Sequence, residues 1–470
     1  MTHSNTGAVT STVSLEAPLA NGVSSTRWAP LMLLSLAICA GAAMRNLFSP
    51  LQETIRLDMG LSDTQMGLIQ GVAISLPITL LSLPFGRLID RYHRTRLLFA
   101  LSLSWTAGTF LTAVAHGFAL LFAAHMLIGF GLFCAIPTAI SLAADLSAPH
   151  ERGRAIFMLM VGDVTGASLA FGLGGLALGA FKNVHSTALL NLSSWRVVQW
   201  IFGAASMITA LMLLALSEPR RNETMGRAQV TVREAIIQLW QQRRLLIPLC
   251  VGQLGMVMAI TAASIWSAPL LARNYGLNDP KIGAYMAWVM LSTGLIGAVM
   301  GGLLADAGYK SARPSGVLHG AVAATALALP ASVFALMPNP TGYVLMLSVM
   351  LCAGTVTSVV TSTALALVIA NELRGMALTV LGTLNGLVGF GITPTLVPAL
   401  TWLDKGSHRL GLALVSVTLF VNAVSLVGYL IAACRMDDLP VPSARRARAA
   451  NVECLKIFGP LCGGRLDRRH

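Results

Sequence analysis

Three ionisable residues fall inside long apolar stretches of the chain. Asp163 lies in the sequence GDVTG, Arg45 lies in the apolar stretch that begins near residue 29, and His125 lies in the stretch 118–145. A charge in the hydrocarbon core of a membrane costs at least a few kcal/mol unless it faces a cavity or a partner. Each of the three is therefore either a functional group or a group held by a structural partner.

Each residue type points to a different chemistry. Asp163 lies about nine residues beyond Arg154, or roughly 14 Å along a helix, where a carboxylate can carry a proton between the two sides. It can equally be a fixed partner of Arg45 or a polar helix contact. Arg45 stays charged and suits an anion clamp, or is a charge that reaches the interface. His125 can titrate near neutral pH, or is a hydrogen-bonded packing residue.

The composition shows where these residues must be held. The chain is 55% hydrophobic and 11% charged, with a mean hydropathy of +0.72, whereas soluble domains carry about 25% charged residues. About 20 apolar residues cross a membrane as a helix, and lipid leaves the backbone no partner but itself. The sequence predicts twelve such helices, at about 29–50, 64–85, 97–115, 118–145, 154–180, 197–217, 245–272, 282–305, 314–336, 342–370, 376–402 and 409–434.

The hydrophilic segments divide the predicted all-α membrane protein into parts. We expect two pseudo-symmetric bundles of six helices. The predicted parts are a cytoplasmic N-terminal tail at 1–27, an N-terminal six-helix bundle at 28–217, a cytoplasmic linker with an amphipathic helix at 218–244, a C-terminal six-helix bundle at 245–435 and a basic cytoplasmic tail at 436–470.

The basic residues predict the orientation. Most of the 32 Lys and Arg residues fall in alternate loops and in the two ends of the chain, which places both termini in the cytoplasm by the positive-inside rule. We expect a multi-pass protein of the cell inner membrane in contact with the lipid bilayer. The basic residues are scattered over short loops, whereas a nucleic-acid site gathers them on one face, so no nucleic-acid partner is expected.

The chain lacks the sequence motifs of ATP binding, metal binding and disulfide frameworks. No Gly-Lys dipeptide is present, and a Walker A loop for ATP needs one. The cysteine spacing fits neither a metal site nor a disulfide framework. We expect no enzyme activity, no catalytic residue, no metal and no cofactor. A hydroxyl-rich run at 355–363 either lines a cavity or bonds to its own helix backbone.

A charged loop motif occurs twice, about half a chain apart. GRLIDRYHRTR begins at Gly86, and its weaker copy GLLADAGYKSAR places Asp306 at the position of Asp90. Such a long period indicates two related halves. Two repeated halves in a membrane chain are typical of a transporter whose site lies between them.

The first motif resembles the cytoplasmic loop signature of the major facilitator superfamily, and the second resembles its degenerate copy. The resemblance spans nearly the whole chain and implies a central cavity and alternating access to the two sides. It also implies a cytoplasmic gate that latches the inner ends of the halves. The residues of that gate would be Gly86, Asp90, Arg91, Arg94 and Asp306.

Within the superfamily, residues 61–71 resemble the spinster-like branch. The chain departs from that branch at three positions, with Met44 before Arg45, with His125 in place of an Arg, and with Leu132 after Gly131 in place of a Glu. Two carboxylates that the branch links to proton coupling and substrate handling are absent. Neither the usual proton route nor a sphingolipid-like substrate follows from the resemblance.

These observations predict a secondary transporter for a small organic solute. The favoured function is proton-coupled symport of an organic anion by a monomer. In this prediction Arg45 binds the substrate, and Asp163 and His125 handle the proton or another coupling ion. The alternatives are proton-driven efflux of drug-like or lipid-like compounds, and a sensor that resembles a transporter without transporting.

Overall fold

The structure is a computed structural model that describes residues 26, 28–148, 150–183, 192–219, 232–311, 313–369, 371–401 and 409–438. The regular elements among these residues are all helices, which confirms the all-α part of the predicted fold class. Eleven of the described helical runs are long and apolar enough to cross a membrane. Most of the predicted tails at 1–27 and 436–470, and part of the linker at 218–244, lie outside the described residues.

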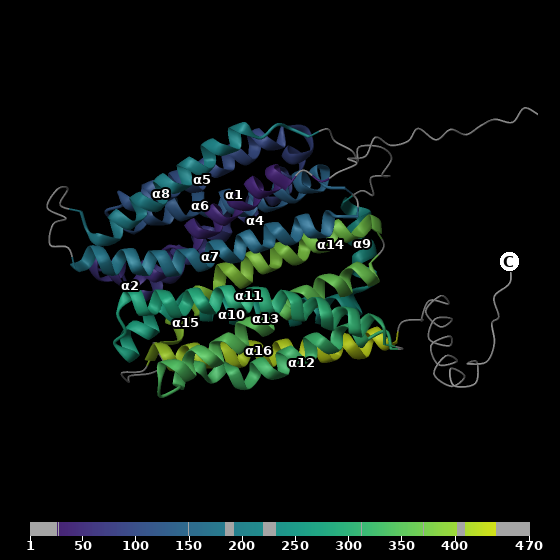
Figure 1. Cartoon of the computed structure of the whole chain (residues 1–470). Coiled ribbons are helices and arrows are strands. Elements are labelled where there is room, and N and C mark those ends of the chain that lie inside the picture. The colour runs from purple at the N-terminus through teal and green to yellow at the C-terminus, as the bar shows by residue number, and fades with distance from the viewer. Residues whose placement is uncertain are drawn as a thin grey trace, which may run out of the picture.

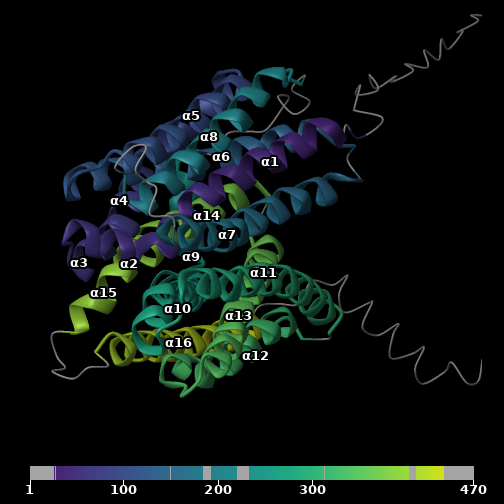
Figure 2. The same cartoon turned by 60° about the vertical axis from the view of Figure 1, so that its left-hand side comes forward.

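The N-terminal half, residues 28–217, lies together on one side of the molecule, with α7 beside the other half (Figures 1 and 2). Its elements are α1 (Trp28–Asn46), α2 (Phe48–Met59), α3 (Asp63–Gln70), α4 (Val72–Arg91), α5 (Arg94–Ala113), α6 (Phe118–Leu146), α7 (Arg152–Asn183), α8 (Ser194–Met212) and the 3₁₀ turn η2 (Leu213–Ala215).

The linker contributes α9 (Val232–Gln241). The C-terminal half, from Arg243 to Asp437, lies on the other side (Figure 1). Its elements are α10 (Arg243–Tyr275), α11 (Asp279–Tyr309), α12 (Gly316–Ala331), the 3₁₀ turn η3 (Ser332–Leu336), α13 (Pro340–Val368), α14 (Asn371–Leu384), the π-helix η4 (Asn385–Ile392), α15 (Thr393–Leu400) and α16 (Arg409–Asp437).

Of the twelve predicted spans, the one at 97–115 has no counterpart among the eleven candidate spans of the described residues. The helix α5 covers it, but α5 begins with two arginines and carries several hydroxyl residues, which lower its hydropathy. It packs against α6 and α8. The count of twelve spans and the division into two six-helix bundles remain predictions.

The first helical run is longer than predicted. We expected it to end near residue 50, but α1 and α2 together form one candidate span from Trp28 to Met59. The α2 segment is amphipathic: Leu51 and Ile55 are fully buried, whereas Glu53 and Arg56 are partly exposed. These polar residues lower the local hydropathy, so an estimate from hydropathy ends the helix too early.

The run predicted at 376–402 is helical but irregular. Its α-helix changes to a π-helix over Asn385–Ile392, just before Pro394. Proline has no backbone N–H for the bond to the fourth residue before it, and its ring crowds that carbonyl. A π-helical turn inside an α-helix often marks a functional site. The irregular segment packs against α4 of the other half.

Glycines on α7 allow close helix packing, both within the N-terminal half and across to the other half. A Cβ on Gly162 would lie 2.5 Å from the Ser35 carbonyl oxygen of α1, and one on Gly175 would lie 2.7 Å from the Asp279 carbonyl oxygen of α11. Only a residue without Cβ fits such contacts, as the glycine-rich sequence of this span predicts. Helix α7 therefore connects α1 to α11, and it holds Asp163 between the halves.

The turns at one end are fixed by caps. Gly60 and Gly276 end α2 and α10 with positive φ values of 64° and 61°. Ser62 then caps α3 in a reciprocal pair with Gln65, and Asn278 accepts from the Lys281 N–H at the start of α11. The charge distribution predicts that this end faces outward, and it is called the outer end below.

Candidate functional site

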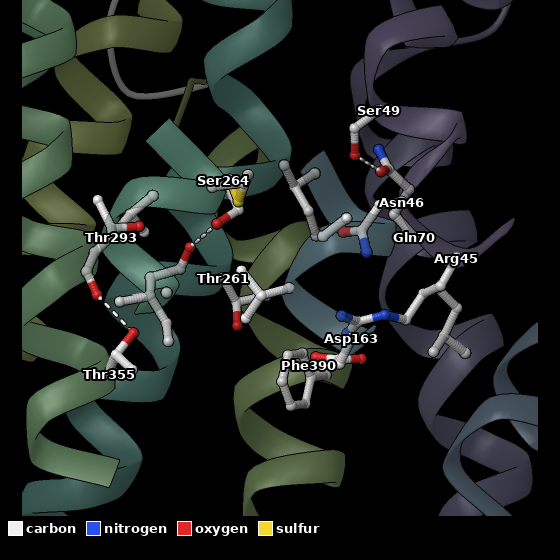
Figure 3. A pocket seen from close by; sticks show the side chains of 18 residues that line it. Arg45, Asn46, Ser49, Gln70, Asp163, Thr261, Ser264, Thr293, Thr355 and Phe390 are labelled. Atoms are coloured by element: carbon white, nitrogen blue, oxygen red, sulfur yellow. Dashed lines mark hydrogen bonds between the residues drawn. The ribbon is translucent and has the colours of Figure 1, made fainter. Parts of the chain in front are cut away.

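A cavity of about 260 Å³ lies between the two halves (Figure 3). Its walls come from α1, α2, α3, α4 and α7 on one side, and from α10, α11, α13 and η4 on the other. Arg45 and Asp163 both line it. The structure thus brings together two of the three ionisable residues that the sequence singled out.

Arg45 sits at the end of α1 and directs its guanidinium into the cavity. The guanidinium carbon lies 5.8 Å from the ring centre of Phe133 and 5.9 Å from that of Phe390. The ion pairs of the described residues include none to Arg45. Its Nε is buried and has no hydrogen-bond partner. Aromatic rings stabilise a cation through their faces and leave its N–H groups free for an anion.

Asp163 is half-buried on α7, and its carboxylate points into the same space as the Arg45 guanidinium (Figure 3). The two groups attract each other electrostatically, but the ion pairs of the described residues do not include one between them. A buried charge that lacks a contact partner is costly. The cavity therefore holds one basic and one acidic side chain that a ligand, a proton or water can reach.

A chain of hydrogen bonds leads away from the cavity within the N-terminal half. Ser49 donates to Gln70 Oε1 at 2.8 Å, and Gln70 Nε2 donates to Gln52 Oε1 at 2.7 Å. The Nε2 of Gln52 is buried without a partner. The sequence prediction gave these residues no role, and it left Gln52 outside the first span, which it ended near residue 50.

Hydroxyl residues line the opposite wall. Ser264 and Thr293 each donate to the carbonyl of the fourth residue before them, at 2.7 Å in both cases. Thr355 does the same at 3.3 Å, and it is the one member of the run 355–363 that lines this cavity. Thr261 is different, because its Oγ1 is buried and has no partner.

His125 lies outside this cavity. It is 1% exposed, its Nδ1 lies 2.9 Å from the Leu121 carbonyl oxygen, and its ring packs edge-on against Phe48 with ring centres 4.4 Å apart. This environment fits the packing interpretation. Among the described residues, no group of three or more His, Cys, Asp and Glu side chains is placed to hold a metal ion.

The first loop motif starts in α4, which carries Gly86, Asp90 and Arg91; the side chains of these residues lie outside what the structure describes. Asp306 is exposed near the end of α11. The gate that the resemblance implies therefore remains a prediction for these four residues.

Arg94 is described, and its partners belong to the N-terminal half. It pairs with Asp145 at 2.6 Å and with Glu218 at 2.9 Å. Burial alone would raise the pKa of the Glu218 carboxyl, but hydrogen bonds from the Thr95 N–H and from Arg94 outweigh it and hold that pKa below its ordinary value. Arg94 thus fastens α5 to α6 and to the segment after α8.

Ion pairs join the two halves at the outer end. The Arg273 guanidinium on α10 binds Glu53 of α2 at 2.6 Å and Asp63 of α3 at 2.7 Å. Lys182 on α7 pairs with Asp279 on α11 at 2.7 Å. The sequence prediction gave these residues no role, since the partners are as much as 220 residues apart and each alone is an ordinary charge near a helix end.

Comparisons with known proteins agree with this architecture. The 3-(3-hydroxy-phenyl)propionate transporter of Escherichia coli strain K12 is 32% identical over 156 residues, which is 33% of this chain and 35% of that protein. The uncharacterized transporter YgaY of Escherichia coli O157:H7 is 31% identical over 192 residues, or 40% of this chain and 44% of that protein. The chain therefore matches less than half the length of these two relatives.

A longer match covers most of the chain. An MFS-type efflux pump of Mycolicibacterium smegmatis is 25% identical over 425 residues, or 89% of this chain and 95% of that protein. The crystal structure of a bacterial homolog of the human lysosomal transporter Spinster, in an inward-facing and unoccupied conformation, has a TM-score of 0.76 at 19% identity. It covers 88% of this chain and 98% of that one, which shows a shared fold. The family model of the Major Facilitator Superfamily matches residues 33–394, so the chain belongs to this superfamily of membrane transporters.

Proposed function

We propose that this protein is a secondary transporter that moves a small organic anion together with a proton by alternating access. Arg45 binds the anionic group and Asp163 carries the proton. The observation that supports this proposal is the Arg45 side chain in the cavity between the halves, charged, without an ion pair and with a buried Nε that lacks a partner. The outer-end ion pairs correspond to a state closed on that side.

A carboxylate substrate would supply the hydrogen-bond and ion-pair partner that Arg45 lacks. The planar guanidinium donates two parallel hydrogen bonds to a carboxylate, an arrangement that an ammonium cannot reproduce. Asp163 does not occupy this place, because no ion pair joins it to Arg45. The substrate then supplies the contact that the protein leaves open.

The charge balance of the cavity links the proton to the substrate. In the empty cavity, the charges of Arg45 and Asp163 offset each other. A bound anion neutralises Arg45 and leaves two negative groups close together, which disfavours the ionised form of one of them. Asp163 then takes up a proton when the substrate binds and releases it on the other side. His125 has no role in this proposal, because it lies outside the cavity.

One relative supports the choice of substrate class. The relative from strain K12 is named as a transporter of 3-(3-hydroxy-phenyl)propionate, which is an organic acid. We further place the protein in the bacterial inner membrane with both termini in the cytoplasm, in accordance with its basic loops. It acts as a monomer in this proposal, because the two halves of one chain complete the cavity.

The test uses an acid and its neutral amide. Benzoate and benzamide compete for binding to the purified wild type, to Arg45→Ala and to Arg45→Lys. We expect the wild type to prefer the acid and both variants to lose this preference. If the preference persists in Arg45→Ala, Arg45 is not the anion clamp.

Coupling is tested separately in proteoliposomes. Asp163→Asn should abolish accumulation of the acid driven by a pH gradient, but it should leave exchange of labelled for unlabelled substrate intact. The matched control is Glu151→Gln, which changes an acidic residue that lies outside the cavity. Accumulation by the Asn variant at the wild-type rate would show that Asp163 does not carry the proton.

A second candidate function is proton-driven efflux of a cation. Asp163 itself lacks an ion pair in the cavity, and the relative that matches most of the chain is named as an efflux pump. In this case Asp163 binds the substrate. Asp163→Asn would then abolish competition by a cationic ligand such as tetraphenylphosphonium, and Arg45→Ala would not.

A further inference from the structure

We infer that the substrate carries a hydroxyl group at the end opposite its acid group, and that Thr261 selects for it. This inference rests on the proposed function, because it assumes that Arg45 binds the acid. The ligand class is therefore a small hydroxy acid with an apolar middle. Thr261 would be a specificity-determining residue on the C-terminal half of the chain.

Two buried polar atoms without partners line the cavity from opposite halves. One is Arg45 Nε on α1, and the other is Thr261 Oγ1 on α10. Thr261 is only 4% exposed. A buried polar group without a partner costs about 1–3 kcal/mol. A ligand with polar groups at both ends would satisfy both atoms at once.

The neighbouring hydroxyls indicate which polar group fits. Ser264, Thr293 and Thr355 all donate their hydroxyl hydrogens to carbonyls of their own helices. Figure 3 shows these bonds for Ser264 and Thr355. Their oxygens still have free lone pairs, so this wall accepts hydrogen bonds. Thr261 alone among the four retains an unused hydroxyl. The Thr261 hydroxyl can both donate and accept, whereas the other three oxygens can only accept. A ligand hydroxyl, which also donates and accepts, therefore fits this wall better than an N–H group, a carbonyl or a second acid group.

The other lining residues and the cavity volume indicate an apolar middle part of the ligand and limit its size. Apolar side chains make up much of the rest of the lining, among them Ile260, Met290, Leu351 and Phe390. A cavity of about 150 Å³ holds benzene, which has six heavy atoms. By that scale, a cavity of about 260 Å³ holds a ligand of roughly ten heavy atoms.

The test compares acids that differ only in the distal hydroxyl. The probes are 4-hydroxybenzoate against benzoate, and 6-hydroxyhexanoate against hexanoate, each competing for binding to the full-length protein in detergent. We expect the wild type to prefer at least one hydroxylated acid by roughly tenfold, the size of one hydrogen bond made in place of an unsatisfied group. Thr261→Val, which keeps the shape of the side chain, should remove that preference, whereas Thr261→Ser should keep it.

The control is Thr325→Val. Thr325 is buried on α12, outside the cavity, and bonds to its own helix, so its loss should leave the preference unchanged. If Thr261→Val keeps the preference, or if the wild type shows none in either pair, the inference is wrong. The acid-against-amide comparison separates the two proposals: a wild type that prefers acids but ignores the hydroxyl refutes only this inference, and one that does not prefer acids refutes the proposed function as well.

Discussion

Removing Arg273 should shift the protein toward a state that is open at the outer end. Arg273 binds Glu53 and Asp63 across the interface between the halves, so these contacts exist only while the outer ends are together. In Arg273→Ala both acids remain in contact with Arg56, at 2.7 Å and 3.8 Å. The change therefore removes attraction between the halves without leaving a carboxylate unpaired.

The structure sets the size of the effect. The three side chains are 22–27% exposed, so each pair lies close to solvent, where an ion pair contributes about 0.2–1 kcal/mol. Two such pairs with good geometry give about 1–2 kcal/mol. Because 1.4 kcal/mol corresponds to a tenfold change, the fraction open at the outer end should rise by about 5- to 30-fold. The Lys182–Asp279 pair remains, so the closed state still forms.

Cysteine labelling measures this shift. A single reporter, Ser264→Cys, is placed in the cavity wall of a variant without its seven native cysteines. A maleimide that cannot cross the membrane is added from outside. Arg273→Ala should raise the labelling rate by the factor given above. Lys281→Ala removes an exposed cation from the same end and should not change it. If both variants label at the same rate as the parent, the ion pairs do not hold the outer end closed.

Three further predictions concern the rest of the fold. Arg94→Ala leaves a buried carboxylate unpaired and should lower the free energy of unfolding by about 3–5 kcal/mol, which a lower melting temperature in detergent would show. The control, Arg96→Ala, changes an exposed residue and should have little effect. Equal melting temperatures of the two variants would contradict this prediction. The lowered pKa of Glu218 gives stability that is complete above the ordinary carboxyl pKa of about 4.3 and is lost as the pH falls through the lowered pKa. Glu218→Gln should flatten this dependence. An unchanged melting profile between about pH 3 and 6, the range around that ordinary carboxyl pKa, would refute the prediction. Gly175→Ala places a Cβ 2.7 Å from a backbone oxygen of α11 and should raise the rate at which the cysteine reporter is labelled from outside. Gly382→Ala, whose Cβ would meet nothing within 4 Å, should not raise this rate. A higher labelling rate in Gly382→Ala than in Gly175→Ala would exclude a role for close backbone packing.

Most of the helices could be predicted from the sequence, because hydropathy is a local property. The same holds for the two charges of the cavity: burying Arg45 or Asp163 in lipid is costly, and both line the space between the halves. The predicted end of the first span was wrong, because α2 carries polar residues on one face and the length of the helical run depends on packing against other helices.

Other parts of the site depend on contacts between distant residues. The sequence gives no sign that Arg273 meets Glu53, which lies 220 residues away. Nor does it distinguish Thr261 from the hydroxyls that bond to their own helices, since the difference lies in side-chain rotation. His125 resembled a proton carrier by residue type alone, and its place against Phe48 depends on how two helices pack.

The pairing of one cation with one anion in the cavity has an electrical consequence. Arg45 and Asp163 are the charged residues among those that line it. If a monovalent anion enters with one proton, each transport cycle moves no net charge across the membrane. A membrane potential acts on moving charge with about 2.3 kcal/mol per elementary charge per 100 mV, so it would exert no force on this cycle. Uptake should then follow the pH gradient and remain unchanged when valinomycin and potassium impose a voltage, and in Asp163→Asn the same voltage should drive the anion by itself.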